Sequence, residues 1–352
     1  MLDLSQARLT TLAVHKVGNK IKEEGIVKSK DLFDFDEDMG QLLEDYFLKP
    51  FKAEEFFKFA HDTDINLNEV YTFCKNIFED SRENFLEHSV ALLQHLYSVS
   101  MHPHIKSGEF YVAHFRECMV EDTPLEAIGL FKSENKDIFL KVEGKEDDVD
   151  MTAEQGINIK KLDKGCLVFN TYADDGFSVL MVDKSSEDTA YWRDDFLHVT
   201  RIQDNSFQTE SFMALTKDFC EEVFAREQDK KEQVVFLNKS LNYFNKNKEF
   251  DLEDFKEEVI VQPEYQDQFD DFRRHREDIE SLPPAEEGFA ISKYAVRSMK
   301  KNFKSLIKLD NEIEIRLPPK KVEEASEYLE RSFDEQRGMF YYKIYFSDEI
   351  ES

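Results

Sequence analysis

A change in hydrophobic period at Gly108 restricts the fold of this chain more than any other feature. From Gly108 to Val182 the apolar residues come in short runs, separated by turn sequences such as Asp163-Lys164-Gly165 and Asp174-Asp175-Gly176. Short apolar runs bounded by Asp and Gly are typical of strands joined by tight loops, so the segment predicts an antiparallel meander. The predicted strands contain Phe110 to Phe115, Ala127 to Phe131, Ile138 to Val142, Ile157 to Ile159, Cys166 to Phe169 and Phe177 to Val182.

The residues before the meander predict a hairpin followed by helices. A strand is expected from Leu9 to Val17, ahead of the Gly18-Asn19 turn, and Ile26 with Val27 is the candidate return strand. Apolar residues then recur at helical spacing. Two or three amphipathic helices are predicted, from apolar residues at 42–47, 70–78 and 85–99.

Helical spacing returns after the meander and gives way to strands near the end. The predicted helices contain residues 207–224, 234–244, 252–259 and 265–279. Further on, a loop at 310–312 would pair Leu309 with Ile313 and Ile307 with Ile315 on a core face. The same register sets Lys308 opposite Glu314 on the outer face. A last strand is expected from Met339 to Phe346.

These patterns predict an α+β protein with two domains. The first domain, residues 1–226, would contain the N-terminal hairpin, the helices and the antiparallel sheet. The second, residues 227–352, would contain a helical section and a small β-rich C-terminal part. The charged run from Arg226 to Glu232 marks the expected boundary.

The composition supports a soluble chain with a large core. The 352 residues are 41% hydrophobic and include 32 Phe but one Trp, which is enough apolar surface for a sizeable core. No stretch approaches the roughly 18 to 20 apolar residues of a membrane span, so we expect a cytoplasmic protein without membrane contact. The cysteines form no C-x-x-C pair, which favours buried free thiols over a zinc motif. They are Cys74, Cys118, Cys166 and Cys220.

Six basic residues and no acidic one lie between Phe289 and Leu309, although the whole chain has a net charge of -29. This basic segment consists of Lys293, Arg297, Lys300, Lys301, Lys304 and Lys308. Helical spacing followed by alternation after Phe303 favours a short helix from about Lys293 to Lys301 that runs into a strand. A chain with this much negative charge repels DNA on average. Any contact with nucleic acid would therefore be local to this segment. The alternative is that Lys308 pairs with Glu314 and the other cations are ordinary solvated residues.

The sequence contains no recognisable motif of a nucleotide-binding or hydrolytic enzyme. The patterns G-x-x-x-x-G-K-[ST], G-x-G-x-x-G and G-x-S-x-G are all missing, so we predict no catalytic residue, no cofactor and no metal. His102-Pro103-His104 is a weak metal pattern because no third ligand accompanies it. The acid pairs Asp174-Asp175, Asp194-Asp195 and Asp270-Asp271 leave an Mg²⁺-dependent nuclease open as the least favoured alternative.

Tyr191, Trp192 and Arg193 form a second candidate binding element. Aromatic and guanidinium side chains stack on bases and are favoured at protein interfaces. The alternative is that Trp192 is a partly buried core residue, as large aromatic residues often are.

Several segments together resemble the bacterial nucleoid-associated protein family of the YejK and NdpA type. They are Gly156 to Leu162 with the run Gly165 to Phe169, Tyr191 to Leu197, the helix from Ser206 to Phe224, the closing strands after Phe289 and the opening strand Leu9 to Val17. The resemblance implies a protein of the cytoplasm that localises with the bacterial nucleoid, without established chemistry. It supplies no fixed list of contact residues.

The resemblance and the basic segment lead to one expectation and one rival. We expect a non-enzymatic nucleoid-associated protein that makes weak, sequence-tolerant contact with DNA or with DNA-bound basic proteins. The rival is an acidic adaptor that holds a basic DNA-processing enzyme. If four to six cations contact phosphates, the logarithm of the DNA affinity should fall with the logarithm of salt at a slope of roughly -4 to -5. The sequence allows a homodimer and does not require one.

Overall fold

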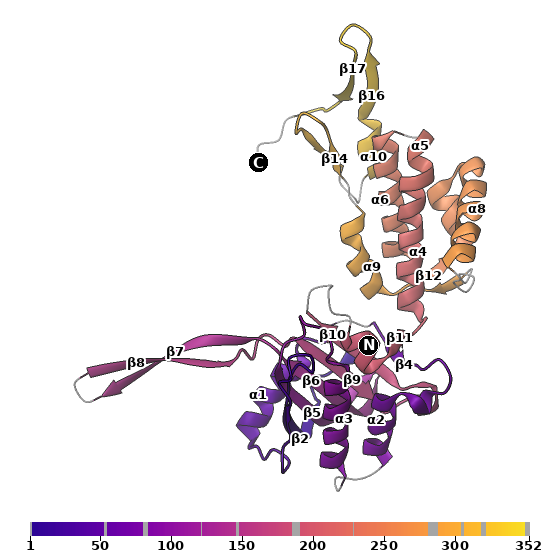
Figure 1. Cartoon of the computed structure of the whole chain (residues 1–352). Helices are drawn as coiled ribbons and strands as arrows, with labels where there is room; N and C mark the ends of the chain where they lie inside the picture. Colours follow the sequence, from indigo (N-terminus) through magenta and orange to yellow (C-terminus); the bar gives the residue numbers. More distant parts are fainter. Residues whose placement is uncertain are drawn as a thin grey trace. The chain divides into compact units, whose positions relative to one another are not determined.

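The computed structural model describes residues 2–52, 55–79, 84–120, 122–145, 148–184, 191–227, 229–280, 288–303, 306–317 and 322–348. The chain divides into two compact units, Met1–Ile202 and Gln203–Ser352. A broad sheet dominates the first unit and helices dominate the second (Figure 1). The predicted α+β class is confirmed.

The first unit is built around one antiparallel sheet. Its strands lie in the order β11-β4-β10-β9-β6-β5-β2-β3, and β1 pairs with β5. The predicted N-terminal hairpin is confirmed as β2 and β3, and β5, β6, β9 and β10 are consecutive neighbours as a meander requires. The three-residue strands β4 and β11 were not predicted. The strands are β1 (Leu2–Asp3), β2 (Arg8–Val17), β3 (Ile26–Val27), β4 (Phe57–Phe59), β5 (Gly108–Val120), β6 (Thr123–Ser133), β9 (Lys164–Phe169), β10 (Ser178–Asp183) and β11 (Val199–Arg201).

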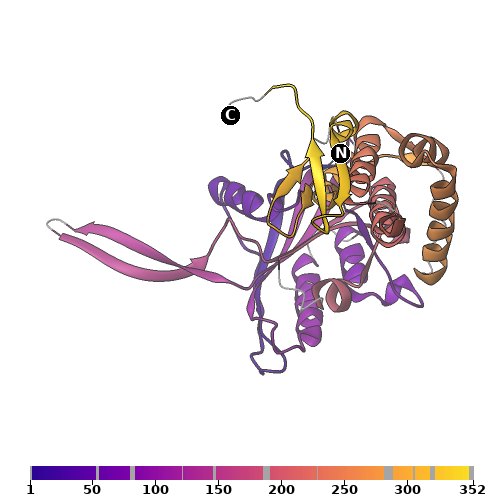
Figure 2. The same ribbon diagram turned by 90° about the horizontal axis from the view of Figure 1, so that it is seen from above.

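Strands β7 (Lys136–Lys145) and β8 (Asp148–Ile157) form a separate two-stranded ribbon, the β7–β8 arm. They leave the sheet between β6 and β9, which pair directly with each other. Figure 2 shows the arm extending away from that sheet. The predicted meander is therefore wrong at this point. The prediction also reduced β8 to residues 157–159, because the polar residues along that strand hide its alternation.

Helices cover both faces of the sheet. Side chains alternate along a strand, so Val112 of β5 lies in the core beneath α2 (Glu69–Glu79) and α3 (Phe85–Val99). Its neighbour Ala113 lies in the opposite core beneath α1 (Glu37–Leu48), where the rings of Phe47 and Phe131 stack at 4.3 Å. Burial on both faces explains why several central strands are continuous apolar runs. Of the two or three helices predicted here, the structure has α1, α2 and α3.

The second unit surrounds a core of phenylalanine rings. Phe212 of α4 lies 4.2 Å from Phe250 and Phe250 lies 4.7 Å from Phe289, measured between ring centroids. These contacts join α4 to the pair of short strands β12 and β13. The predicted helical section is confirmed. Its elements are α4 (Asn205–Phe219), α5 (Ala225–Glu227), α6 (Lys230–Lys246), β12 (Glu249–Asp251), α7 (Leu252–Phe255), α8 (Pro263–Glu280), β13 (Gly288–Ala290) and α9 (Lys293–Met299).

The division between the units falls before the expected boundary after residue 226. Helix α4 contacts α6, α8 and α9, so it belongs with the helices that follow it. The charged run from Arg226 to Glu232, which suggested a linker, lies within the second unit. A hydrophilic run marks a surface segment, and a surface segment need not separate domains.

Small hairpins end the second unit. Strands β14 (Leu306–Lys308) and β15 (Glu314–Arg316) pair in the predicted register, with Ile307 opposite Ile315. Strand β16 (Leu329–Asp334) pairs with the predicted last strand, β17 (Met339–Ile344), and α10 (Val322–Glu327) precedes it. Ile307 and Leu329 share a small apolar core with Val234 of α6.

The structure bears on the expectations for the cysteines and for membrane-spanning helices. All four cysteines are buried free thiols, as predicted. Among the described helices, none is both long enough and apolar enough to cross a membrane.

Candidate nucleic-acid interface

The basic segment begins as a helix, as predicted. Ser292 caps α9, because its hydroxyl accepts a hydrogen bond from the Ala295 N–H at 3.2 Å. Val296 of α9 is buried, while Arg297 is exposed. A short 3-10 turn, η6 (Lys300–Asn302), continues the helix, and β14 begins at Leu306.

The side chain of Lys293 stabilises the fold through hydrogen bonds to the main chain. Its ammonium group donates hydrogen bonds to the main-chain oxygens of Phe244 and Asn245, at 3.0 Å each, and of Asn247, at 2.6 Å. These oxygens lie at the C-terminal end of α6, where carbonyl groups lack helical partners and attract positive charge. Desolvation of this ammonium lowers the pKa of Lys293.

Lys308 is engaged as well. Its ammonium lies 2.7 Å from Glu314 across the β14–β15 pair, as the register predicts. The hydrogen bond from Lys308 lowers the pKa of the Glu314 carboxyl. Lys304, another predicted contact residue, lies outside the described residues.

Three cations of the basic segment remain, Arg297, Lys300 and Lys301, and we call them the basic turn. All three are exposed, and within the described part of the chain none of their side chains makes a hydrogen bond or an ion pair. Positions i, i+3 and i+4 lie on one side of a helical turn, so the three charges face solvent together. Of the six predicted contact residues, these three are exposed and have no side-chain partner among the described residues.

The stacking role expected of Tyr191 and Trp192 does not fit the structure. Trp192 is fully buried, with its ring 4.8 Å from that of Phe196, and Tyr191 is 4% exposed. Both belong to the core of the first unit, so their ring faces are covered. Arg193 is exposed, but its Nε lies 2.6 Å from a carboxylate oxygen of Asp194.

A network of buried charges beneath Tyr191 was missed from the sequence. The ammonium of Lys132 is 1% exposed and donates to the Lys106 carbonyl at 2.7 Å, to Glu134 at 2.8 Å and to the Tyr191 hydroxyl at 2.9 Å. Burial lowers the pKa of Lys132 and raises that of Tyr191. Lys164, directly opposite Lys132 in the sheet, is also buried and pairs with Asp183 at 2.8 Å. The sequence feature that could have indicated this network is the presence of a lysine in each of two apolar strands, at positions that face each other.

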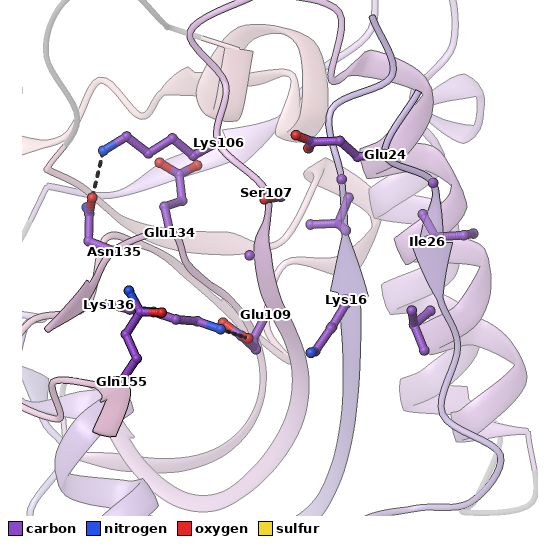
Figure 3. Close-up of a pocket in the computed structure, with 15 residues that line it drawn as sticks. Lys16, Glu24, Ile26, Lys106, Ser107, Glu109, Glu134, Asn135, Lys136 and Gln155 are labelled. Carbon is purple, nitrogen blue, oxygen red and sulfur yellow. Dashed lines mark hydrogen bonds and ion pairs between the residues drawn. The ribbon is translucent and has the colours of Figure 1, made fainter. Parts of the chain in front are cut away.

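A polar cavity of about 680 Å³ lies between the start of β5 and the start of β7. Figure 3 shows Lys106 directed toward Asn135, at 2.6 Å, and Lys136 toward Glu109, at 2.7 Å. The charged residues of its lining are three lysines and three glutamates, so the cavity offers no net charge to a phosphate or to a cation. Its charged lining residues are Lys16, Lys106, Lys136, Glu24, Glu109 and Glu134.

At least one carboxylate of each acid pair considered for a nuclease lies beside a cation, and Asp194 lies 2.6 Å from Arg193. Asp175 lies 2.8 Å from Lys58, Asp270 lies 2.9 Å from Lys256 and Asp271 lies 2.7 Å from Arg274. Within the described ranges, no three His, Cys, Asp or Glu side chains gather as a metal site would require. The nuclease alternative gains no support from these residues.

Comparison with known proteins supplies the family. The model of the family described as nucleoid-associated protein YejK matches residues 13–335, which is most of the chain and includes residues of both units. The chain belongs to this family. The predicted resemblance is thereby confirmed. The YejK family is not known as enzymatic. Among curated proteins, none matches this YejK-family chain.

Proposed function

We propose that this protein is a non-enzymatic member of the nucleoid that associates with the bacterial chromosome in the cytoplasm, and that the basic turn makes its direct contact with DNA. Arg297, Lys300 and Lys301 are exposed and have no side-chain partner among the described residues, and this observation carries the proposal. Membership of a nucleoid-associated family supports it.

The contact should be weak and tolerant of sequence. Three cations reach a few phosphates, and phosphate contacts carry no base information. The net charge of -29 opposes approach to DNA at long range. Because Lys293 and Lys308 already have partners, we expect a slope of about -3 in a plot of log affinity against log salt, smaller in magnitude than six free cations would give.

A DNA titration at several salt concentrations tests this proposal. The wild-type chain should bind short duplexes of unrelated sequence with similar affinity. Reversing the charges of the basic turn should remove most of the salt-dependent affinity. Retained affinity with an unchanged slope would place the contact elsewhere.

A second candidate function, the acidic adaptor, is favoured by the segment from Asp31 to Asp38. Its five acidic residues surround Leu32 and Phe33, which are 36% and 43% exposed. Exposed apolar side chains within acidic surroundings suit a basic protein surface, because charge guides the encounter and apolar contact adds affinity. Binding of a basic DNA-processing protein should weaken steeply with added salt.

A pull-down from bacterial lysate tests the adaptor at low and at moderate salt. Capture of a basic DNA-processing protein that survives nuclease treatment would support it. Recovery of DNA from the untreated lysate, without such a protein before or after nuclease treatment, would exclude it and leave the basic turn as the working surface.

A further inference from the structure

The β7–β8 arm presents an exposed apolar face to solvent. Ile138, Leu140 and Val142 of β7 are 72%, 68% and 57% exposed, and Val149 and Met151 of β8 are 64% and 60% exposed. Large apolar side chains at these exposures are common singly on protein surfaces, but a contiguous set usually marks an interaction site.

The register of the arm gathers these residues on one side. Val142 lies opposite Met151, and Leu140 lies opposite Ala153. Residues at odd and even positions point to opposite faces of a strand, so the charged residues of the arm alternate with the apolar ones. Lys141 and Glu143, for example, share the other face and form an ion pair of 2.7 Å. The apolar face therefore contains no ionisable side chain from Ile138 to Val142 or from Val149 to Ala153.

The arm also lacks the support that an isolated ribbon needs. A two-stranded hairpin is marginally stable in water without a third strand or a packed face. Among the described elements, β7 and β8 make their extensive contacts with each other alone. An additional surface covering the apolar face would supply this support.

We propose that the apolar face of the β7–β8 arm is a homodimer interface, in which the arms of two copies pack face to face. The exposed surface of these five residues is roughly 600 Å² per copy, so its complete burial in a pair would remove at most about 1,200 Å², at the lower end of stable interfaces. An uncharged face matches itself without bringing like charges into contact. The apolar face has no acidic group that could pair with a basic partner, which favours a second copy of the chain as the occupant.

The acidity of the chain sets the salt dependence of this dimer. Between Lys136 and Ile157 seven acidic residues oppose three basic ones, so two arms repel each other at long range. Added salt screens the repulsion and leaves the apolar contact in place. Dimer affinity should therefore rise with salt, whereas binding of DNA or of a basic protein should fall.

Sedimentation equilibrium of the full chain, over a range of protein and salt concentrations, tests the proposal. The wild type should form a dimer whose dissociation constant decreases as salt increases. Met151→Glu should raise that constant at least roughly tenfold, because each copy would place a carboxylate in the apolar contact.

Thr152→Glu is the matched control, since it adds the same charge at the next position on the opposite face. It should leave the dissociation constant close to that of the wild type. Circular dichroism of both variants establishes that the fold is retained. A wild type that stays monomeric at every concentration and salt would overturn the proposal, as would a Met151→Glu chain that dimerises as tightly as Thr152→Glu. The test does not involve DNA, so its result is independent of the function proposed above.

Discussion

The ammonium of Lys293 donates a hydrogen bond of 2.6 Å to the main-chain oxygen of Asn247. This contact joins the start of α9 to the end of α6. Lys300, seven positions further along the same segment, is exposed to solvent. One basic segment thus contains a cation that stabilises the fold and a cation that is available to a partner, and substitution separates the two roles.

Lys293→Gln should lower the free energy of unfolding by about 1–2 kcal/mol, because charge-assisted hydrogen bonds to the end of α6 are lost. Lys300→Gln removes the same charge from an exposed position and should change stability by less than about 0.5 kcal/mol. Urea denaturation followed by circular dichroism measures both. Equal stability of the two variants would contradict the capping role of Lys293.

Reversal of the basic turn by Arg297→Glu, Lys300→Glu and Lys301→Glu together should flatten the salt slope of DNA binding from about -3 toward zero. The control reverses three exposed lysines of the first unit, Lys22→Glu, Lys28→Glu and Lys30→Glu. Net charge changes equally in both triple variants, so a difference between them reports location rather than total charge. DNA titrations at four or more salt concentrations make the comparison, and equal loss of affinity in the two variants would count against a localised contact.

The fluorescence of Trp192 should be unaffected by DNA. This residue is the single tryptophan of the chain and is completely buried, so its emission should be blue-shifted and protected from a soluble quencher. A positive control combines Trp192→Phe with Lys300→Trp, which moves the tryptophan into the basic turn, where DNA should quench it. Quenching of wild-type Trp192 by DNA would restore the stacking role that the structure does not support.

His15 should make the first unit less stable at mildly acidic pH. The ring is 2% exposed; its Nδ1 accepts a hydrogen bond from the Ser29 N–H at 3.0 Å, and its Nε2 lies 3.0 Å from the Ser89 hydroxyl oxygen. That hydroxyl donates to the Leu86 carbonyl, so Nε2 is the donor and the neutral ring fits both contacts. Burial lowers the pKa of His15 from 6.5 to about 4.

The sign of the effect follows from this lowered pKa. As pH falls below 6.5, the unfolded chain takes up the proton before the folded chain does, so the free energy of unfolding decreases between pH 6.5 and 4, by up to about 3 kcal/mol. His15→Gln should reduce this pH dependence, whereas His104→Gln, at an exposed histidine, should retain it. Denaturation at pH 7 and pH 5, followed by Trp192 emission, makes the measurement. An identical pH dependence in the two variants would contradict the assignment to His15.

The sequence predicts those features that depend on period and register. The alternation around Lys308 and Glu314 was sufficient to pair them, because a two-residue period leaves one register that keeps Ile307 in the core. Helices were found wherever apolar residues recur at helical spacing. Strand β8 escaped prediction because one of its faces is charged and the other lies on an arm outside the core.

The candidate site depends on contacts between distant residues, which no local pattern contains. Lys293 meets the end of α6 nearly fifty positions earlier in the chain, and nothing within the basic segment distinguishes it from Lys300. Tyr191 is likewise of a residue type that is favoured at interfaces, but it lies in the core of the first unit beside Lys132. Tertiary neighbours therefore decide which cations are exposed to a partner and which side chains stabilise the fold.

The pairing of β2 with β5 has a consequence for synthesis. Strand β2 leaves the ribosome well before its long partner β5, which begins at Gly108 after α1, α2 and α3. Its other neighbour, β3, contributes two residues. A nascent chain therefore holds an unpaired strand throughout that interval, and such an edge is open to pairing with other chains. Translation that stalls before β5 would release a fragment prone to aggregation, whereas a stall beyond β11 would release a chain with every strand of this sheet present.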